Sequence, residues 1–386
     1  MKILYHHRIA SKDGQYVHIE EIIKALKKQG HEVILVAPSM GEEQDFGGDG
    51  GLVSQLKSKL PKWLYETIEF AYSFWALAKL GTAIVKHKPD FIYERYNLLN
   101  PSGIWAKKLF KLPLLLEINA PLLEERSKYD GLSLQGLARW SQEYTWRNAD
   151  YVLPVTNVLA QHQRDIGIPD ERIRVIPNGI NKSEFIDKQH VNPLNVDVSD
   201  KIVVGFVGFC REWHGLDKIV QLLGKPGNEN LFFLLVGDGP AVAGIRKVAK
   251  DSGIEDRLYV TGLVKRDDMP AWLGPIDIAL QPAVVDYASP LKMLEYMATG
   301  KAIVAPKQAN IEELLSDGEN ALLFDPNDQQ TFVDACDKFI HNEALREKLA
   351  TAAKESIYTR NLTWNGNVAT IVGLGKTLCP DSIAKE

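Results

Sequence analysis

The chain has 386 residues, of which 45% are hydrophobic and 25% charged, with a formal net charge of −5. This length predicts two domains, and the lack of a basic excess argues against a nucleic-acid partner. The cysteines Cys210, Cys336 and Cys379 show neither a disulfide framework nor metal-ligand spacing. We see no signal peptide and no run of 18 apolar residues, so we expect a cytoplasmic protein, with attachment to the inner face of a membrane left open.

The first half predicts a parallel sheet with helices on its faces. A strand at Ile3–Tyr5 and a loop from Arg8 to Val17 precede a helix with apolar residues spaced i, i+3, i+4, i+7 between Ile19 and Leu26. Gly30 ends this helix, and a strand follows at 33–36, which makes a βαβ unit. Further strands are predicted at 91–93, 114–116, 151–154 and 173–176.

A glycine-rich, acidic loop is predicted at 41–51, and a helical stretch rich in aromatic residues follows from Trp63 to Lys86. Most of these aromatic side chains are expected to line the core or an acceptor groove. A face that touches a membrane is the alternative.

The second half repeats the alternation of strands and helices after a polar linker, 181–201. Strands are predicted at 203–208, 232–236, 258–260, 277–280, 303–305 and 321–324, and helices at 216–223, 241–251, 290–300, 329–341 and 343–357. The pattern predicts an α/β protein with two doubly wound domains, at 1–185 and 186–363. The default ligand site is a cleft between the carboxyl ends of their strands.

The segment Ser289–Gly300 is the most informative in the chain. Ser289 is a good N-cap and Pro290 a good first helical residue, so the helix N-terminus is well defined and attracts anions. Lys292 lies in the first turn, where the helix dipole disfavours a cation unless a phosphate is near. Glu295 follows three residues later, and the alternative is a solvated Lys–Glu pair.

Two glycine loops are predicted at the same sheet edge as Lys292. Gly208–Gly215 and Gly237–Pro240 each follow a strand and can offer backbone N–H groups to a phosphate, although turns need glycine anyway. Arg211 can add a guanidinium contact. Together with Lys292 these loops predict a diphosphate site, in which Glu295 would accept hydrogen bonds from a ribose diol.

These segments resemble the retaining GT-B glycosyltransferases of family four, in particular the exopolysaccharide-type group. The resemblance extends over most of the chain in family order. The segments that carry it are 176–181 (IPNGIN), 208–215 (GFCREWHG), 235–240 (LVGDGP), 261–264 (TGLV), 289–301 (SPLKMLEYMATGK) and 317–324 (DGENALLF).

The resemblance implies roles for particular residues. It implies donor-binding residues at Gly14, Gly208, His214, Gly237, Gly239, Gly262, Val264, Tyr287, Ser289, Pro290, Leu291 and Glu295. Catalytic roles are assigned to Arg211, Lys292, Asn119 and Glu117. It also implies that a final helix, at about 364–386, crosses back to the first domain, with Trp364 near the crossing. The apolar positions between Val368 and Leu378 fit such a helix.

The sequence departs from the family at two positions. Tyr287 stands where many members have a glutamate that helps to hold the donor sugar, so the sugar is not identified. His214 stands where many members carry lysine, which leaves Arg211 as the main cation of its loop.

The first half has fewer matching residues. Glu117–Pro121 (EINAP) resembles a family segment in which Asn119 would bind a sugar hydroxyl and Glu117 would orient an acceptor. The alternative is that Asn119 caps a turn. Glu94 and Arg95 are expected to form a structural ion pair, and His18 is expected to be structural as well.

The expected function is transfer of a hexosyl group from a nucleoside diphosphate sugar to a sugar or lipid-linked acceptor. The resemblance implies retention through front-face attack, with the leaving phosphate taking the acceptor proton. We expect no cofactor and no metal, because no cluster with ligand spacing is visible. A sugar-nucleotide epimerase of the same fold and a catalytically inactive sugar-binding partner are the alternatives.

Overall fold

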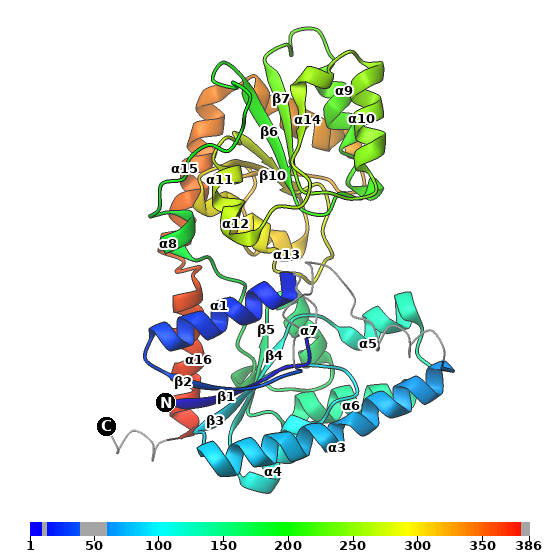
Figure 1. Ribbon diagram of the computed structural model, residues 1–386, viewed down its shortest axis with the longest axis vertical. Coiled ribbons are helices and arrows are strands. Elements are labelled where there is room, and N and C mark those ends of the chain that lie inside the picture. Colours follow the sequence, from blue (N-terminus) through cyan, green and yellow to red (C-terminus); the bar gives the residue numbers. More distant parts are fainter. Residues whose placement is uncertain (10–13, 39–59, 380–386) are drawn as a thin grey trace. The chain divides into compact units, whose positions relative to one another are not determined.

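The computed structural model describes residues 1–9, 14–38 and 60–379. The chain divides into two units, each with its own sheet and core (Figure 1). Unit 1 comprises Met1–Asn178 and Trp364–Glu386, and unit 2 comprises Gly179–Thr363. The division therefore falls between Asn178 and Gly179 rather than after residue 185, because Ile180 and Phe185 pack in the core of unit 2.

Unit 1 contains a five-stranded parallel sheet in the order β2-β1-β3-β4-β5. Its strands are β1 (Lys2–His6), β2 (Glu32–Val36), β3 (Phe91–Arg95), β4 (Leu114–Ile118) and β5 (Tyr151–Pro154). The strand predicted at 173–176 is wrong. That segment runs beside β5 through two backbone hydrogen bonds and a single bridge at Ile173, and Pro177 follows it.

Helices cover both faces of this sheet. They are α1 (Gly14–Lys28), α3 (Lys62–His87), α4 (Ser102–Phe110), α5 (Leu122–Glu125), α6 (Gln135–Asn148), α7 (Asn157–Asp165) and α16 (Trp364–Leu378). α1 and α16 pack together on the face that carries Phe91, which α16 approaches through Gly375. α4 lies on the opposite face with α3, since Gly103 abuts Glu94.

Two details differ from the sequence-based expectation, and one lies outside the structure described. Helix α1 begins at Gly14, so the predicted loop does not extend to Val17. The loop predicted at 41–51 lies outside the described residues. The predicted aromatic helix is confirmed as α3, but none of its aromatic side chains is fully buried, so their expected place in the core is wrong. The last helix packs on α1 of unit 1 as expected.

Unit 2 contains a six-stranded parallel sheet in the order β11-β10-β9-β6-β7-β8. Its strands are β6 (Ile202–Val207), β7 (Leu231–Val236), β8 (Leu258–Val260), β9 (Ile278–Leu280), β10 (Ala302–Pro306) and β11 (Leu322–Phe324). β6 has the next strand, β7, on one side and the later β9 on the other. The strand order therefore reverses between β6 and β9, which is where such sheets bind ligands.

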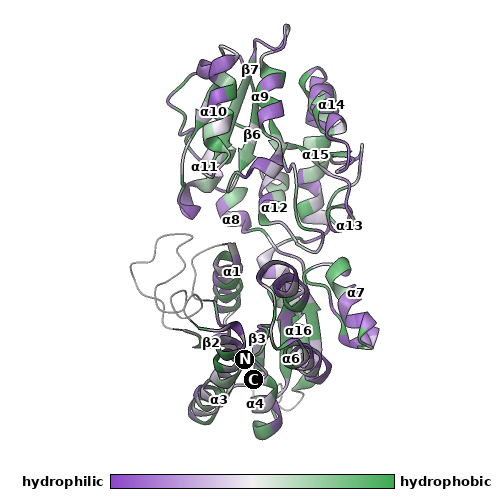
Figure 2. Ribbon diagram, turned by 90° about the vertical axis from the view of Figure 1, so that its right-hand side faces the viewer, coloured by the Kyte–Doolittle hydropathy of each residue, from purple (hydrophilic) through white to green (hydrophobic). Residues whose placement is uncertain are grey.

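The helices of unit 2 are α8 (Lys182–Phe185), α9 (Asp217–Leu223), α10 (Val242–Asp251), α11 (Met269–Leu273), α12 (Leu291–Ala298), α13 (Ala309–Glu312), α14 (Gln329–Ile340) and α15 (Glu343–Thr359). Alternate residues of β6 face different cores. Val204 and Phe206 pack with α9, α10 and α14, whereas Val203 and Val207 pack with α11, α12 and α15. Figure 2 shows the strands largely hydrophobic, with polar residues on the outer helix faces. The predicted α/β class with two doubly wound sheets is confirmed.

Candidate functional site

The two glycine loops of unit 2 pack backbone against backbone at the carboxyl ends of β6 and β7. A Cβ atom on Gly237 would lie 2.1 Å from the carbonyl oxygen of Gly208, and one on Gly239 would lie 2.1 Å from that of Cys210. The Cys210 N–H also donates to the Asp238 carbonyl at 2.7 Å. Only glycine fits at 237 and 239, and their φ angles of 140° and 148° favour glycine as well.

Side chains from the neighbouring elements hold these loops. The buried Tyr296 of α12 accepts from the Val207 N–H at 3.0 Å and donates to the Leu280 carbonyl at 3.3 Å, which ties β6 to β9. Thr261 accepts from the Gly237 N–H at 3.0 Å. The sequence analysis missed both residues, although a tyrosine one position after Glu295 within a buried helix needs a hydrogen-bond partner.

Lys292 lies in the first turn of α12, and its ammonium reaches the loop after β6. A Cβ atom on Gly208 would stand 3.1 Å from the Lys292 Nζ, which rests over the Phe206 ring at 4.5 Å. Burial lowers the pKa of Lys292 to about 8, with Glu295 and Cys210 opposing the shift. Among the described residues, no carboxylate lies within ion-pair distance of this ammonium. The site therefore places a partly buried cation beside the Gly208 backbone.

His214 supports the loop and does not add a second cation. The ring is buried between Phe206 and Trp213, and its Nδ1 accepts from the Arg211 backbone N–H at 3.0 Å. Burial, with a smaller contribution from Lys292, lowers the pKa of His214 to about 4, so the ring is neutral at pH 7. The exposed guanidinium of Arg211 lies over the Phe209 ring at 5.1 Å.

Glu295 is buried on α12, and its carboxylate accepts a hydrogen bond from Arg266. Arg266 in turn lies over the Phe185 ring at 5.1 Å. A ribose diol would have to share Glu295 with this guanidinium or displace it. The sequence analysis missed Arg266, although it follows the 261–264 segment by two residues.

The other donor-binding candidates lie around the start of α12 and after β8. The helix begins at Leu291, with Pro290 as N-cap and no side-chain cap hydrogen bond, so the predicted capping by Ser289 is wrong. Asn310 holds the preceding loop by donating to the carbonyls of Val285 and Ala288 at 3.1 and 2.8 Å. That loop includes Tyr287.

In the segment after β8, Gly262 is explained by its backbone conformation and Val264 by the packing of its side chain. Gly262 has a φ angle of 72°, which explains a glycine there without any ligand. Val264 packs against the core of unit 2. Its backbone, rather than its side chain, is therefore the part available to a nucleotide base.

Unit 1 contains a buried network centred on Glu117 of β4. One carboxylate oxygen accepts from Arg95 at 2.6 Å, and the other accepts from the Tyr93 hydroxyl at 2.6 Å and lies 3.0 Å from His18 Nε2. His18 and Arg95 lower the pKa of Glu117 to about 2 despite its burial. Glu117 is thus an anion whose partners are all side chains of unit 1, and each of its carboxylate oxygens already accepts a hydrogen bond from one of them.

His18 joins this network to two residues at the chain ends of the unit 1 segments, Asn178 and Trp364. Its Nδ1 lies 2.5 Å from the Asn178 Oδ1, and its ring meets the edge of Trp364 with centroids 4.9 Å apart. From the sequence, His18 is expected to have only a structural role. The contact with Glu117 links residues far apart in sequence, so no local pattern reveals it.

The expected ion pair between Glu94 and Arg95 is wrong. Successive residues of a strand point to opposite faces of the sheet, so the two side chains cannot meet. Glu94 instead hydrogen bonds to His6 at 2.8 Å, and Arg95 pairs with Glu117.

Asn119 follows β4 at the carboxyl edge of the sheet. Its Oδ1 is buried and has no hydrogen-bond partner among the described residues, so this atom does not cap a turn. A buried acceptor without a partner requires an explanation, and a ligand hydroxyl would supply one. Gly14 is the first residue of α1.

The described residues contain no group of three or more His, Cys, Asp or Glu side chains that could hold a metal ion.

Comparisons with known proteins identify the family of this chain. Residues 12–184 match the model of Glycosyltransferase Family 4, and residues 190–356 match that of Glycosyl transferases group 1. An uncharacterised glycosyltransferase of Methanocaldococcus jannaschii is 23% identical over 92% of each chain. The lipopolysaccharide core biosynthesis glycosyltransferase LpsE of Rhizobium meliloti is 26% identical over 55% of this chain and 60% of its own length.

A solved structure with the same fold is that of Anabaena HepE in complex with UDP. It has a TM-score of 0.72 and 18% identity over 98% of this chain and 100% of its own. The two family matches together cover most of the chain, one mainly over unit 1 and the other within unit 2. The chain belongs to the family-four glycosyltransferases of the GT-B type.

Proposed function

We propose that this glycosyltransferase moves a hexosyl group from a nucleoside diphosphate sugar to an acceptor hydroxyl, with retention of anomeric configuration. The relatives named above include a lipopolysaccharide enzyme, and a structure of the same fold was solved with UDP. The first supports a role in polysaccharide or glycoconjugate synthesis. The second supports a donor whose nucleotide is UDP.

The observation that carries the proposal is the Lys292 ammonium, which has no carboxylate partner among the described residues and lies beside the Gly208 backbone. A diphosphate would supply the missing negative charge. Arg211, from the same loop, would add a second cation, and His214 would remain neutral. These groups would stabilise charge on the leaving diphosphate without a metal ion or cofactor.

The donor and acceptor would be held by different groups. Glu295 would accept from the ribose hydroxyls, and the Gly262–Val264 backbone would face the base. In unit 1, the Asn119 Oδ1 would accept from an acceptor hydroxyl. The leaving phosphate would take the acceptor proton as the new bond forms on the same face of the sugar.

The proposal is tested by incubating the protein with a panel of nucleoside diphosphate sugars and simple acceptors. We expect release of a nucleoside diphosphate and, by NMR, a product with the anomeric configuration of the donor. An inverted product would refute retention. Isomerised nucleotide sugar, with deuterium taken up from solvent, would indicate the epimerase. Binding without any turnover would indicate the inactive sugar-binding protein.

A further inference from the structure

The outer side of α3 is mostly apolar between Trp63 and Val85. Half or more of the side-chain surface of Trp63, Phe74 and Val85 is exposed, at 55%, 61% and 66%, and Trp75 is 48% exposed. The exposed positions between Trp63 and Val85 carry a single charge, Lys79. Such a continuous apolar surface is uncommon on a protein that faces only water.

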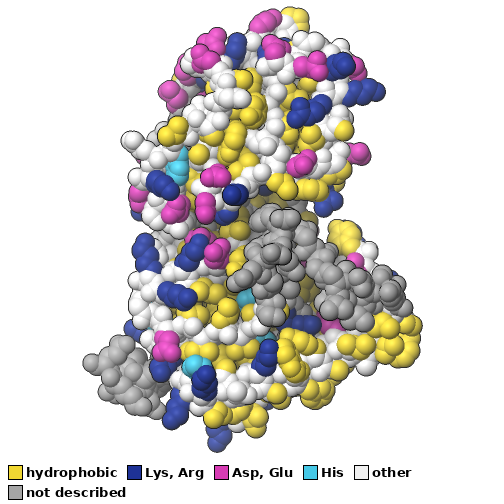
Figure 3. Space-filling model, in the orientation of Figure 1, with side chains coloured by type: hydrophobic (Ala, Val, Ile, Leu, Met, Phe, Trp, Pro, Cys, Tyr) yellow, Lys and Arg dark blue, Asp and Glu magenta, His cyan; other side chains and the backbone are white. Residues whose placement is uncertain are grey.

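Ring contacts extend this surface onto α4 and α6. Phe74 lies 5.2 Å from Trp105 of α4, and Phe70 lies 6.0 Å from Trp140 of α6, measured between ring centroids. Leu109 of α4 is 66% exposed and Trp140 is 45% exposed. We call the set Trp63, Phe74, Trp75, Val85, Leu109 and Trp140 the apolar patch. Figure 3 shows hydrophobic side chains gathered over α3.

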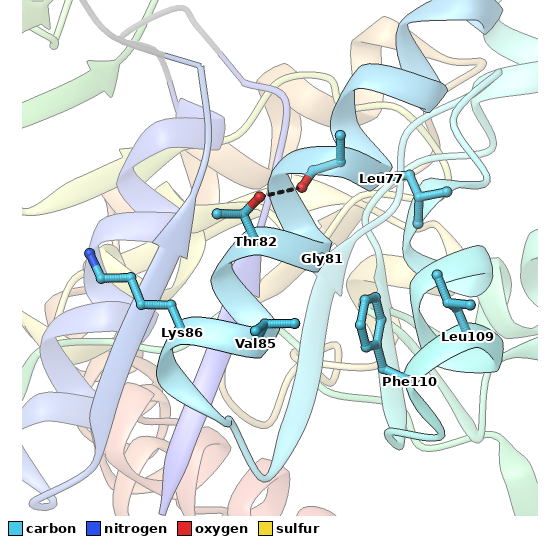
Figure 4. Close-up of a pocket in the computed structure, with 8 residues that line it drawn as sticks. Leu77, Gly81, Thr82, Val85, Lys86, Leu109 and Phe110 are labelled. Carbon is cyan, nitrogen blue, oxygen red and sulfur yellow. Dashed lines mark hydrogen bonds between the residues drawn. The ribbon is translucent and has the colours of Figure 1, made fainter.

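A shallow groove runs between α3 and α4 within this surface (Figure 4). Leu77, Gly81 and Val85 line one side, and Leu109 and Phe110 line the other. The Thr82 hydroxyl donates to the Ala78 carbonyl at 2.9 Å, so its hydrogen-bond donor is already used within the helix. The groove therefore offers apolar contact with few free polar groups.

The charges on α3 and α4 have one sign at the surface. The five lysines of these helices are Lys62, Lys79, Lys86, Lys107 and Lys108. Lys107 pairs with Asp150 at 2.6 Å, and the other four have no ion pair among the described residues. Lys79 lies over the Trp75 ring at 3.8 Å, and Lys108 lies over Tyr144 at 4.7 Å, so cations border the aromatic rings. The two acids of the described helices α3 and α4 are both engaged. Glu66 accepts from the Ser133 and Leu134 N–H groups, and Glu69 pairs with Arg126.

We propose that the apolar patch binds an anionic lipid surface, with the side chains of the patch in the interface and the lysines at the headgroups. Tryptophan and lysine side by side on one face of a helix are typical of segments that lie in the membrane interface. Anionic headgroups attract such lysines. This inference does not depend on the proposed reaction.

The helix lies on the membrane rather than across it. α3 is long and apolar enough to cross a bilayer by length and composition, and it is the one such helix in the described part of the chain. Its inner side, however, is committed to unit 1. Glu66 and Ser73 are buried with hydrogen bonds to the chain around them, and α3 packs along α4. Insertion across a bilayer would break these contacts.

A second copy of the chain fits the patch less well than lipid. A symmetric dimer through this face would bring the lysines of α3 near one another, and like charges oppose such an interface. A lipid surface with negative headgroups neutralises them instead.

The test is sedimentation of the full-length protein with vesicles of equimolar phosphatidylglycerol and phosphatidylcholine, and with phosphatidylcholine alone. We expect binding to the anionic vesicles that weakens as salt screens the lysines. Trp63→Glu with Phe74→Glu should reduce the vesicle affinity by about tenfold or more, because two large apolar side chains no longer enter the interface. Lys79→Gln with Lys86→Gln should reduce it by on the order of tenfold or more on anionic vesicles only.

Matched changes elsewhere serve as controls. Val191→Glu with Val196→Glu alters two exposed apolar residues of unit 2, and Lys247→Gln with Lys250→Gln removes two exposed lysines there. Both should leave vesicle binding unchanged. Circular dichroism and thermal melting verify that every variant folds.

Three outcomes would overturn the proposal. They are no binding of the wild type, binding equal for both vesicle types, or equal loss in the control variants. A lipid-free dimer in light scattering that Trp63→Glu with Phe74→Glu dissociates would assign the patch to a second copy and would also overturn it.

Discussion

The two units hold their buried charges in opposite ways. In unit 1, the Glu117 carboxylate accepts hydrogen bonds from Arg95 and Tyr93 and lies 3.0 Å from His18 Nε2. Its negative charge is therefore compensated inside the protein. In unit 2, Lys292 rests on the Phe206 ring, and among the described residues no carboxylate lies within ion-pair distance of it. Burial lowers the pKa of Lys292, whereas the partners of Glu117 lower its pKa against the effect of burial.

This difference separates two roles for buried charge. A buried network of compensating charges stabilises the fold and fixes the orientation of its outer members, here His18. A desolvated cation without a carboxylate partner instead lowers the stability of the ligand-free protein, and an anionic ligand would remove this penalty. We therefore expect mutations of Glu117 to act mainly on stability and mutations of Lys292 mainly on activity.

The largest effect is expected for Glu117→Gln, which leaves Arg95 buried without its counter-charge. Breaking a buried ion pair in this way should lower the free energy of unfolding by about 3–5 kcal/mol. Urea denaturation measures the change. Glu143→Gln, which removes a surface pair with Arg147 on α6, is the control and should cost less than about 1 kcal/mol.

The same network predicts acid sensitivity. The pKa of Glu117 is lowered from 4.5 to about 2, so its stabilisation is complete above pH 4.5 and is lost as the pH falls toward 2. The loss should reach about 3 kcal/mol in the wild type and vanish in Glu117→Gln. Parallel acid curves for the two proteins would contradict this account of Glu117.

Lys292→Ala should lower kcat/KM by the factor that corresponds to a loss of about 2–4 kcal/mol of transition-state stabilisation, because one cation at the diphosphate is lost. The free energy of unfolding should stay the same or rise, since the ammonium is desolvated in the empty protein.

Lys301→Ala is a matched control for Lys292. Burial lowers the pKa of Lys301 to about 8 as well, but Lys301 donates to the Gly274 carbonyl at 2.8 Å. Its loss should reduce stability and leave kcat/KM near the wild-type value. Equal activity losses for the two lysines would remove the distinction between them.

Glu295 offers a smaller effect. If its carboxylate accepts from the ribose hydroxyls, 2′- and 3′-deoxy nucleotides should bind the wild type more weakly by about 1.5–3 kcal/mol, as for a hydrogen bond to a charged group. Glu295→Ala should bind deoxy and ordinary nucleotides alike. Calorimetry of the four combinations isolates the interaction, and a deoxy penalty that survives in the variant would exclude the ribose role.

The smallest expected effect is that of metal removal. The charges assigned to the diphosphate are those of Lys292, Arg211 and the backbone, so excess chelator should leave the rate unchanged. Rates with EDTA and with added Mg²⁺ or Mn²⁺ give the comparison. A requirement for added metal would mean that Lys292 and Arg211 are insufficient at the leaving group.

The sequence predicted the parts of this comparison that depend on local pattern. The alternation of strands and helices placed Gly208, Gly237 and Lys292 at one sheet edge, because parallel strands end at the same side. The pairs Glu117–His18 and Glu295–Arg266 were not predicted, since each joins elements whose relative positions only the fold sets.

Two local interpretations failed for identifiable reasons. The pairing of Glu94 with Arg95 overlooked the alternation of strand side chains. Capping by Ser289 failed because the helix begins one residue later, with Pro290 as its N-cap.

The most direct test of the diphosphate assignment is proton uptake on nucleoside diphosphate binding, measured by calorimetry in buffers of different ionisation enthalpy between pH 8 and 9. With a pKa of about 8, Lys292 is partly neutral there in the free protein, and a bound diphosphate should raise that pKa. We predict that the wild type takes up a fraction of a proton and that Lys292→Ala takes up none. Equal proton uptake by the two proteins would contradict the assignment of the diphosphate to Lys292.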